Sequence, residues 1–218
     1  MGVTNLPRYT LGEEIANSIT HGLGIVAAIT ALTVLTAFAT LHGSSAHIVG
    51  CAIFGATLII LYTASTLYHS ILAQHLKPFF RALDHSAIFL LIAGTYTPFM
   101  LVNLRGPWGW SLLAVIWTIG IVGIVLRLCL RGRLHGLIVG LYIAMGWVVL
   151  IATKPLLANV DTGGLILLAG GGIAYTAGVV FYQWKRLPYH HAIWHGFVLL
   201  GSALHFFAVL FFVIPWRQ

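Results

Sequence analysis

The sequence predicts an all-α integral membrane protein, a seven-transmembrane helix bundle with its N-terminus cytoplasmic and its C-terminus outside. Of its 218 residues, 60% are apolar and 7% charged, and the mean hydropathy is +0.98. A soluble domain is about 45–50% apolar and about a quarter charged. Residues 15–76 contain no Asp, Glu, Lys or Arg. This composition excludes an ordinary soluble protein, a disordered chain and a nucleic-acid-binding protein. The pI near 9.8 is better explained by topology and anionic lipid.

Seven apolar runs can cross a bilayer, because a helix needs about 20 apolar residues to span the hydrocarbon core. The expected spans are 16–41, 46–72, 82–104, 109–131, 134–153, 163–184 and 190–213. Prolines and charges separate several of them, as in Lys77-Pro78, Arg105-Gly106-Pro107 and Lys154-Pro155. Residues 1–15 then form a cytoplasmic N-terminal segment, 16–213 the membrane domain and 214–218 a short C-terminal end. We expect a multi-pass protein of a bacterial cytoplasmic (inner) membrane.

The basic residues are distributed unequally between the two ends of the predicted bundle. The N-terminus and the loops after the even-numbered spans share one side and hold eight of the eleven Lys and Arg residues: Arg8, Lys77, Arg81, Arg127, Arg131, Arg133, Lys185 and Arg186. The other side holds Arg105, Lys154 and Arg217. Because cytoplasmic loops carry an excess of Lys and Arg, the N-terminus is expected in the cytoplasm.

Polar side chains within the spans converge at the predicted cytoplasmic face. Odd-numbered spans begin at that face and even-numbered spans end there, which places these residues at one depth: Asn17, His21, Ser65, His69, Asp84, His85, His191 and His195. Ionisable groups inside a membrane are costly and mark functional sites. His191 and His195 are four residues apart, so both rings lie on one helical face. His205 lies about 15 Å deeper, where it lines a cavity or forms an interhelical hydrogen bond.

This pattern predicts a metal site. Three imidazoles with one open position are a common catalytic zinc arrangement, and zinc lowers the pKa of a bound water toward neutrality. A neighbouring carboxylate such as Asp84 then orients that water or takes its proton. Three imidazoles favour Zn²⁺, one ion per chain, with another divalent ion as the alternative. The two cysteines, Cys51 and Cys129, belong to no CxxC pair and are expected to be buried free thiols.

Five motifs resemble those of the bacterial haemolysin III-related proteins, which belong with the progestin and adipoQ receptor family. They are residues 13–22, 64–69, 83–88, 93–99 and 188–197, and the resemblance runs nearly end to end. It implies a seven-helix fold with a cytoplasmic N-terminus, zinc ligands at His69, His191 and His195, an acid at Asp84 beside the zinc-bound water, and a hydroxyl at Ser65 one turn before the first ligand. A similar Ser-His, Asp and His-His pattern in alkaline ceramidases implies metal-dependent hydrolysis of lipid amides.

The sequence is compatible with three functions. The first is a zinc-dependent hydrolase of membrane lipid with a role in membrane lipid and energy homeostasis. In that interpretation Asp84 is the general base and Ser65 helps hold the oxyanion, while Asn17, His21 and His205 surround the metal or line the cavity. The second is a non-enzymatic lipid or membrane-state sensor in which zinc is structural and Asp84 is its fourth ligand. The third is a cytolysin, as the family name suggests. Membrane lipid is the expected substrate or ligand in the first two, whereas protein partners and the oligomeric state are left undetermined.

Overall fold

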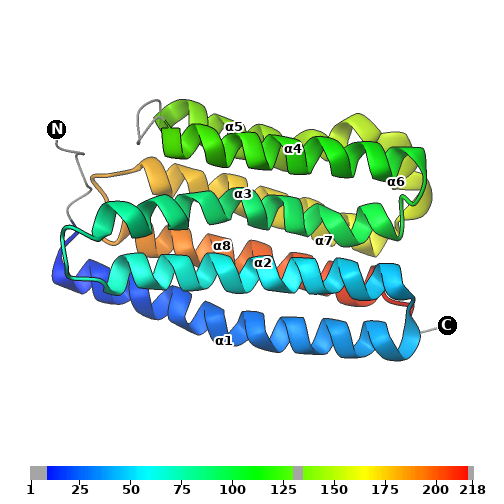
Figure 1. Ribbon diagram of the computed structural model, residues 1–218, viewed down its shortest axis with the longest axis horizontal. Coiled ribbons are helices and arrows are strands. Elements are labelled where there is room, and N and C mark those ends of the chain that lie inside the picture. Colours follow the sequence, from blue (N-terminus) through cyan, green and yellow to red (C-terminus); the bar gives the residue numbers. More distant parts are fainter. Residues whose placement is uncertain (1–8, 130–134, 216–218) are drawn as a thin grey trace.

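The computed structural model describes residues 9–129 and 135–215, and within them the chain is helical with no strand. Figure 1 shows the helices side by side, with their axes along the long dimension of the molecule. The helices are α1 (Leu11–His42), α2 (Ser45–Ser70), α3 (Lys77–Leu101), α4 (Pro107–Cys129), α5 (His135–Trp147), α6 (Thr153–Asn159), α7 (Thr162–Gln183) and α8 (His190–Phe212). A 3₁₀ turn, Val148–Ala152, joins α5 to α6. The expectation of an all-helical membrane fold is therefore confirmed.

The helix ends follow local signals that extend two of the helices beyond their apolar runs. Thr10 accepts a hydrogen bond from the backbone N–H of Glu13, whose carboxylate accepts one from the Thr10 N–H at 2.8 Å. This capping box starts α1 at Leu11 rather than at residue 16. Helix α3 starts at Lys77 rather than at residue 82, because Pro78 fits the first turn, where N–H groups have no helical partner. The last residues of the expected fourth span lie outside the described residues, as do Arg8, Arg131, Arg133 and Arg217.

The interpretation of Lys154-Pro155 as a separator between two spans is wrong. Both residues lie in the first turn of α6, which tolerates proline for the same reason. The helical path is instead interrupted earlier, where Tyr96 of α3 reaches into it. The Tyr96 hydroxyl donates to the carbonyls of Met145 and Gly146 and accepts from the Val149 N–H at 3.0 Å. A side chain inserted into the backbone hydrogen bonds in this way converts a turn to 3₁₀ geometry.

Within the described residues, six helical segments are long and apolar enough to cross a membrane: α1, α2, α4, the α5–α6 segment, α7 and α8. Many of their Leu, Ile, Val and Phe side chains are exposed, as a lipid-facing surface requires. Helix α3 carries Lys77, Arg81, Asp84 and His85 near its start, and α2, α4, α5 and α8 pack against it. Polar groups on α3 are therefore enclosed by other helices.

The two cysteines differ in their surroundings. Cys51 is buried between helices as expected, but Cys129 is exposed at the end of α4, so the prediction that both are buried is wrong. An apolar run in a membrane protein faces either lipid or the protein interior, and hydropathy alone does not distinguish the two.

Candidate metal centre

Three histidines meet at one end of the bundle, where α2 ends and α8 begins. His69 is the penultimate residue of α2, while His191 and His195 occupy successive turns of α8. One ring nitrogen from each lies within 4.8 Å of the other two, and all three side chains are buried. The distances between ring centroids are 4.6–5.3 Å. This group could hold a metal ion.

Glu14 of α1 orients the ring of His69. Its Oε2 lies 2.7 Å from His69 Nδ1, and its other carboxylate oxygen pairs with Lys77. Because an ionised carboxylate can only accept, Nδ1 carries the proton and Nε2 carries the lone pair. His69 Nε2 is buried without a hydrogen-bond partner. The ring is thus in the tautomer and orientation of a metal ligand supported by a carboxylate.

His195 is held in a similar way by Thr20 of α1. The Thr20 hydroxyl donates to the carbonyls of Ala16 and Asn17, so its oxygen accepts from His195 Nδ1 at 3.1 Å. That bond leaves Nε2 of His195 with its lone pair. His191 has no partner at either ring nitrogen, although it is buried. A buried imidazole without a hydrogen bond is unfavourable, so this donor set fits a bound cation.

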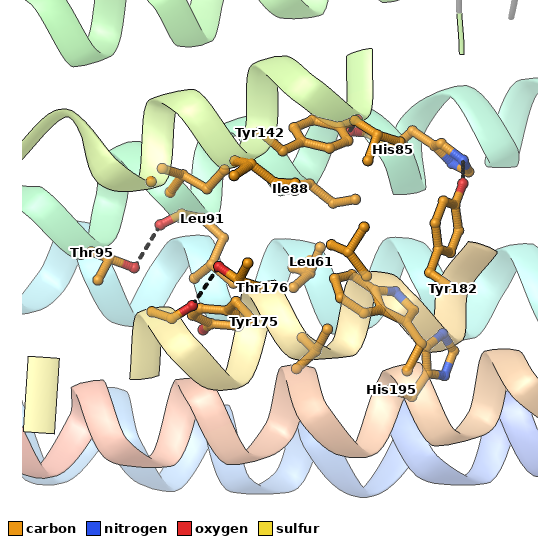
Figure 2. A pocket seen from close by; sticks show the side chains of 18 of the residues that line it. Leu61, His85, Ile88, Leu91, Thr95, Tyr142, Tyr175, Thr176, Tyr182 and His195 are labelled. Carbon is orange, nitrogen blue, oxygen red and sulfur yellow. Dashed lines mark hydrogen bonds between the residues drawn. The ribbon is translucent and has the colours of Figure 1, made fainter. Parts of the chain in front are cut away.

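A long apolar cavity begins at this cluster and extends along the bundle. It encloses about 1110 Å³ of space not filled by atoms, part of which is open to the outside. Figure 2 shows His195 and Tyr182 at one end and Thr95, Leu91 and Tyr175 at the other, with Leu61 between them. A cavity with this apolar lining suits an extended apolar ligand.

Asp84 lies in the wall of this cavity together with His191 and His195. Its Oδ2 is 3.3 Å from Nδ1 of His85, the next residue of α3. The structure therefore brings Asp84 beside the three rings but outside the group of atoms within 4.8 Å. Ser65 is fully buried one turn before His69, and its hydroxyl has no hydrogen-bond partner.

The other three predicted residues occupy different places. The Asn17 amide lies 3.4 Å from His69 Nδ1, beside the Glu14 contact. His21 stacks on His195, with ring centroids 3.5 Å apart and planes 12° from parallel. His205 lies outside the group of three rings. It lines the same cavity farther along, and its Nε2 contacts the Leu168 carbonyl at 3.2 Å. The sequence left a cavity and an interhelical bond as alternatives for His205, and both are present.

Sequence reasoning assigned no role to three residues that contact the rings: Tyr9, Glu14 and Thr20. The sequence places Glu14 on one helical stripe with Asn17 and His21, but this spacing does not show which ring the carboxylate contacts. Tyr9 packs over His69 and His191, with ring centroids 5.7 and 5.2 Å away. Burial, more than the neighbouring Tyr68, raises the pKa of Tyr9, so its hydroxyl stays protonated. No sequence pattern indicated that this residue covers the site.

Replacing Glu14 with glutamine is expected to weaken metal binding by about 10–100-fold, because the charge that supports His69 is lost. Competition between the purified protein and a chelating indicator for Zn²⁺ measures the change. Glu13→Gln is the matched control, since Glu13 caps α1 and contacts none of the three rings. Equal affinities for the two variants would contradict the orienting role of Glu14.

Comparison with known proteins identifies the family of the chain. The haemolysin-III-related family model matches residues 9–206. Hemolysin-3 of Bacillus cereus is 50% identical over 203 residues, which cover 93% of each chain. The Hemolysin-3 homolog of Bacillus subtilis (strain 168) is 48% identical over 94% of this chain and 97% of its own. The human monocyte to macrophage differentiation factor is 29% identical over 92% of this chain and 84% of its own. The chain belongs to the haemolysin-III-related family and is a multi-pass protein of the cytoplasmic membrane.

Proposed function

We propose that this protein is a zinc-dependent hydrolase of membrane lipids that acts in membrane lipid and energy homeostasis. The observation that carries the proposal is the cluster of three buried imidazoles at the end of a long apolar cavity, with Asp84 in the wall beside them. Within the described residues, no carboxylate or thiolate belongs to the group. Three imidazoles with an open fourth position favour Zn²⁺ in a catalytic rather than a structural role.

The residues around the cluster have different roles in the proposed hydrolysis. The three rings would hold a zinc ion, which would supply a Lewis acid able to acidify water and polarise a carbonyl oxygen. Asp84 accepts the proton of the attacking water, whose oxygen bonds to the acyl carbon. The Ser65 hydroxyl, buried without a partner, donates to the oxygen that becomes negative. The acyl bond then breaks, and the proton on Asp84 passes to the leaving group.

The apolar cavity accounts for the choice of a lipid. Its walls include Ile88, Leu91 and Val198, and they hold an acyl chain while excluding bulk water. The ceramidase-like cleavage of an amide is the reaction that the motif resemblance favours.

We further propose seven membrane crossings, which are the six long apolar segments and α3, with the N-terminus in the cytoplasm. Helix α1 begins and α8 ends at opposite ends of the bundle, as an odd number of crossings requires (Figure 1). The start of α3, the end of α4 and the segment after α7 lie at the end that carries the histidine cluster, and they bring Lys77, Arg127 and Lys185 there. An excess of basic residues marks that end as cytoplasmic.

Similarity to Hemolysin-3 of Bacillus cereus favours a second candidate, a cytolysin. Lysis through a pore does not need the Asp84 carboxylate, whereas lysis that follows lipid hydrolysis does. Release of haemoglobin from red cells by the unaltered protein and by Asp84→Asn distinguishes the two. Equal lysis by both proteins would support the cytolysin and count against the hydrolase.

Metal removal tests the hydrolase proposal. Detergent-purified protein is incubated with ceramide and with a panel of acyl lipids, and the released fatty acid is measured. We expect release to stop after chelation and to return with Zn²⁺ but not with Mg²⁺. Undiminished release from protein that contains no metal would overturn the zinc mechanism. Absence of release from zinc-loaded protein across the panel would favour the lipid sensor with structural zinc.

A further inference from the structure

A second pocket lies beside the metal centre and has a different chemistry from the apolar cavity. Its walls include Arg81 from α3, His135 from α5 and Lys185 from the segment after α7, together with Tyr9, Tyr68 and Tyr182. We call this the basic pocket. It shares His85, Tyr182 and His191 with the apolar cavity, so the two spaces meet at the metal centre.

The cations of the basic pocket are paired with no carboxylate in its lining, although Asp84 lies near enough to act on Arg127. Among the residues that line it, none is Asp or Glu. Neither Arg81 nor Arg127 forms an ion pair with another described residue, and the Nε atom of each is buried without an acceptor. Arg127 is close enough to Arg81 for the two charges to repel each other. Burying like charges together is unfavourable unless an anion joins them.

Lys185 is the second cation in the lining of the basic pocket after Arg81, since Arg127 lies outside that lining. Its Nζ lies 4.4 Å from the centre of the Tyr182 ring and donates to the Tyr182 carbonyl at 2.6 Å, which holds the ammonium beside the pocket. Burial and then the charge of Arg81 lower the pKa of Lys185. A bound anion would relieve both effects.

Hydroxyl groups complete the lining. The Tyr182 hydroxyl lies 3.3 Å from Nε2 of His85, whereas those of Tyr9 and Tyr68 form no hydrogen bond with another described residue. Protonated phenols donate hydrogen bonds to anionic oxygens. The planar guanidinium of Arg81 and the ammonium of Lys185 are the groups that proteins use to bind phosphate.

We propose that the basic pocket binds the phosphate of a lipid headgroup, so that the substrate is an anionic acyl phospholipid rather than a neutral lipid such as the ceramide that the motif resemblance favours. This assignment of the substrate rests on the proposed function. The acyl chain lies in the apolar cavity and the scissile carbonyl at the metal centre, because the two spaces meet there. Hydrolysis adds one water across the acyl bond and releases a fatty acid and the fragment that carries the phosphate.

Three short-chain probes test the assignment: dihexanoyl phosphatidate, dihexanoylglycerol, which has the same chains without phosphate, and inorganic phosphate. Their affinities for the full chain in detergent are measured by calorimetry, with the protein as purified and again after chelation. We expect phosphatidate to bind at least about tenfold more tightly than either other probe. Arg81→Gln and Lys185→Gln are each expected to weaken its binding by about tenfold. Arg105→Gln, an exposed arginine in the turn between α3 and α4, is the control and leaves the affinity unchanged.

The outcomes separate this proposal from the hydrolase itself. Equal binding of phosphatidate and dihexanoylglycerol, or unchanged binding in both variants, would overturn the headgroup assignment even if chelator-sensitive hydrolysis is observed. Inorganic phosphate that binds as tightly as phosphatidate would assign the pocket to a free anion and overturn the lipid part. Binding of phosphatidate that depends on Arg81 and Lys185 and survives chelation supports the headgroup site even if no hydrolysis is found.

Discussion

Replacing His191 with alanine is expected to reduce bound zinc from about one ion per chain to near zero. His191 supplies one of three imidazoles, and both of its ring nitrogens are buried with no other hydrogen-bond partner. Two remaining rings and water cannot match the affinity of three rings held in one orientation. Zinc binding should therefore be lost rather than merely weakened.

Elemental analysis of detergent-purified protein, prepared without chelator, measures this loss. His205→Ala is the matched control, because His205 is also a buried histidine of α8 that lines the apolar cavity but lies outside the cluster. Helical content and elution volume show whether each variant folds. Equal zinc in His191→Ala and in the unaltered protein would disprove the three-histidine site. Loss of zinc in a folded His191→Ala, with zinc retained in His205→Ala, would establish it.

The positions of the helices follow from hydropathy, but their ends do not. Each apolar run expected to span the membrane corresponds to a helical segment, since a bilayer leaves an apolar chain few alternatives. Lys154 and Pro155 misled the interpretation of one boundary because proline has opposite effects in the first turn and in the interior of a helix. The break before them depends on Tyr96, which is distant in sequence, so no local pattern could have located it.

The histidine cluster was predictable because topology converts distance along the chain into depth in the membrane. Counting Lys and Arg placed His69, His191 and His195 at one face before any geometry was known, and the structure brings their rings together. The groups that hold the rings were not predictable to the same degree. Glu14 and Thr20 meet His69 and His195 through the packing of α1 against α2 and α8, which sequence spacing does not describe.

The basic pocket escaped sequence analysis for a related reason. Its cations were counted only as topology signals, and that explanation suffices for charges that lie in water beyond the membrane. Arg81 and Arg127 are not fully exposed to water, because the Nε atom of each is buried without an acceptor. The extent of burial distinguishes a charge that only sets the topology from a charge that can bind a ligand. Burial depends on how the helices pack, so the sequence alone does not give it.

Replacing Asp84 with asparagine is expected to reduce lipid hydrolysis by about 10²–10⁴-fold while zinc stays bound. Asparagine keeps the size of the side chain and can still accept a hydrogen bond from His85, but it cannot take a proton from water. The loss should fall on turnover rather than on lipid affinity, because the proton moves only during the reaction.

Fatty acid release and zinc content are measured on the same preparations of the unaltered protein, Asp84→Asn and Asp161→Asn. Asp161 is exposed before α7, and its side chain makes no capping hydrogen bond, so Asp161→Asn controls for the loss of one carboxylate. Unchanged release from Asp84→Asn would remove the general base. Loss of zinc from this variant would show that Asp84 is a fourth metal ligand, which is the closed arrangement of a structural site. Retained zinc with lost turnover would leave the carboxylate in the cavity wall as the group that moves the proton.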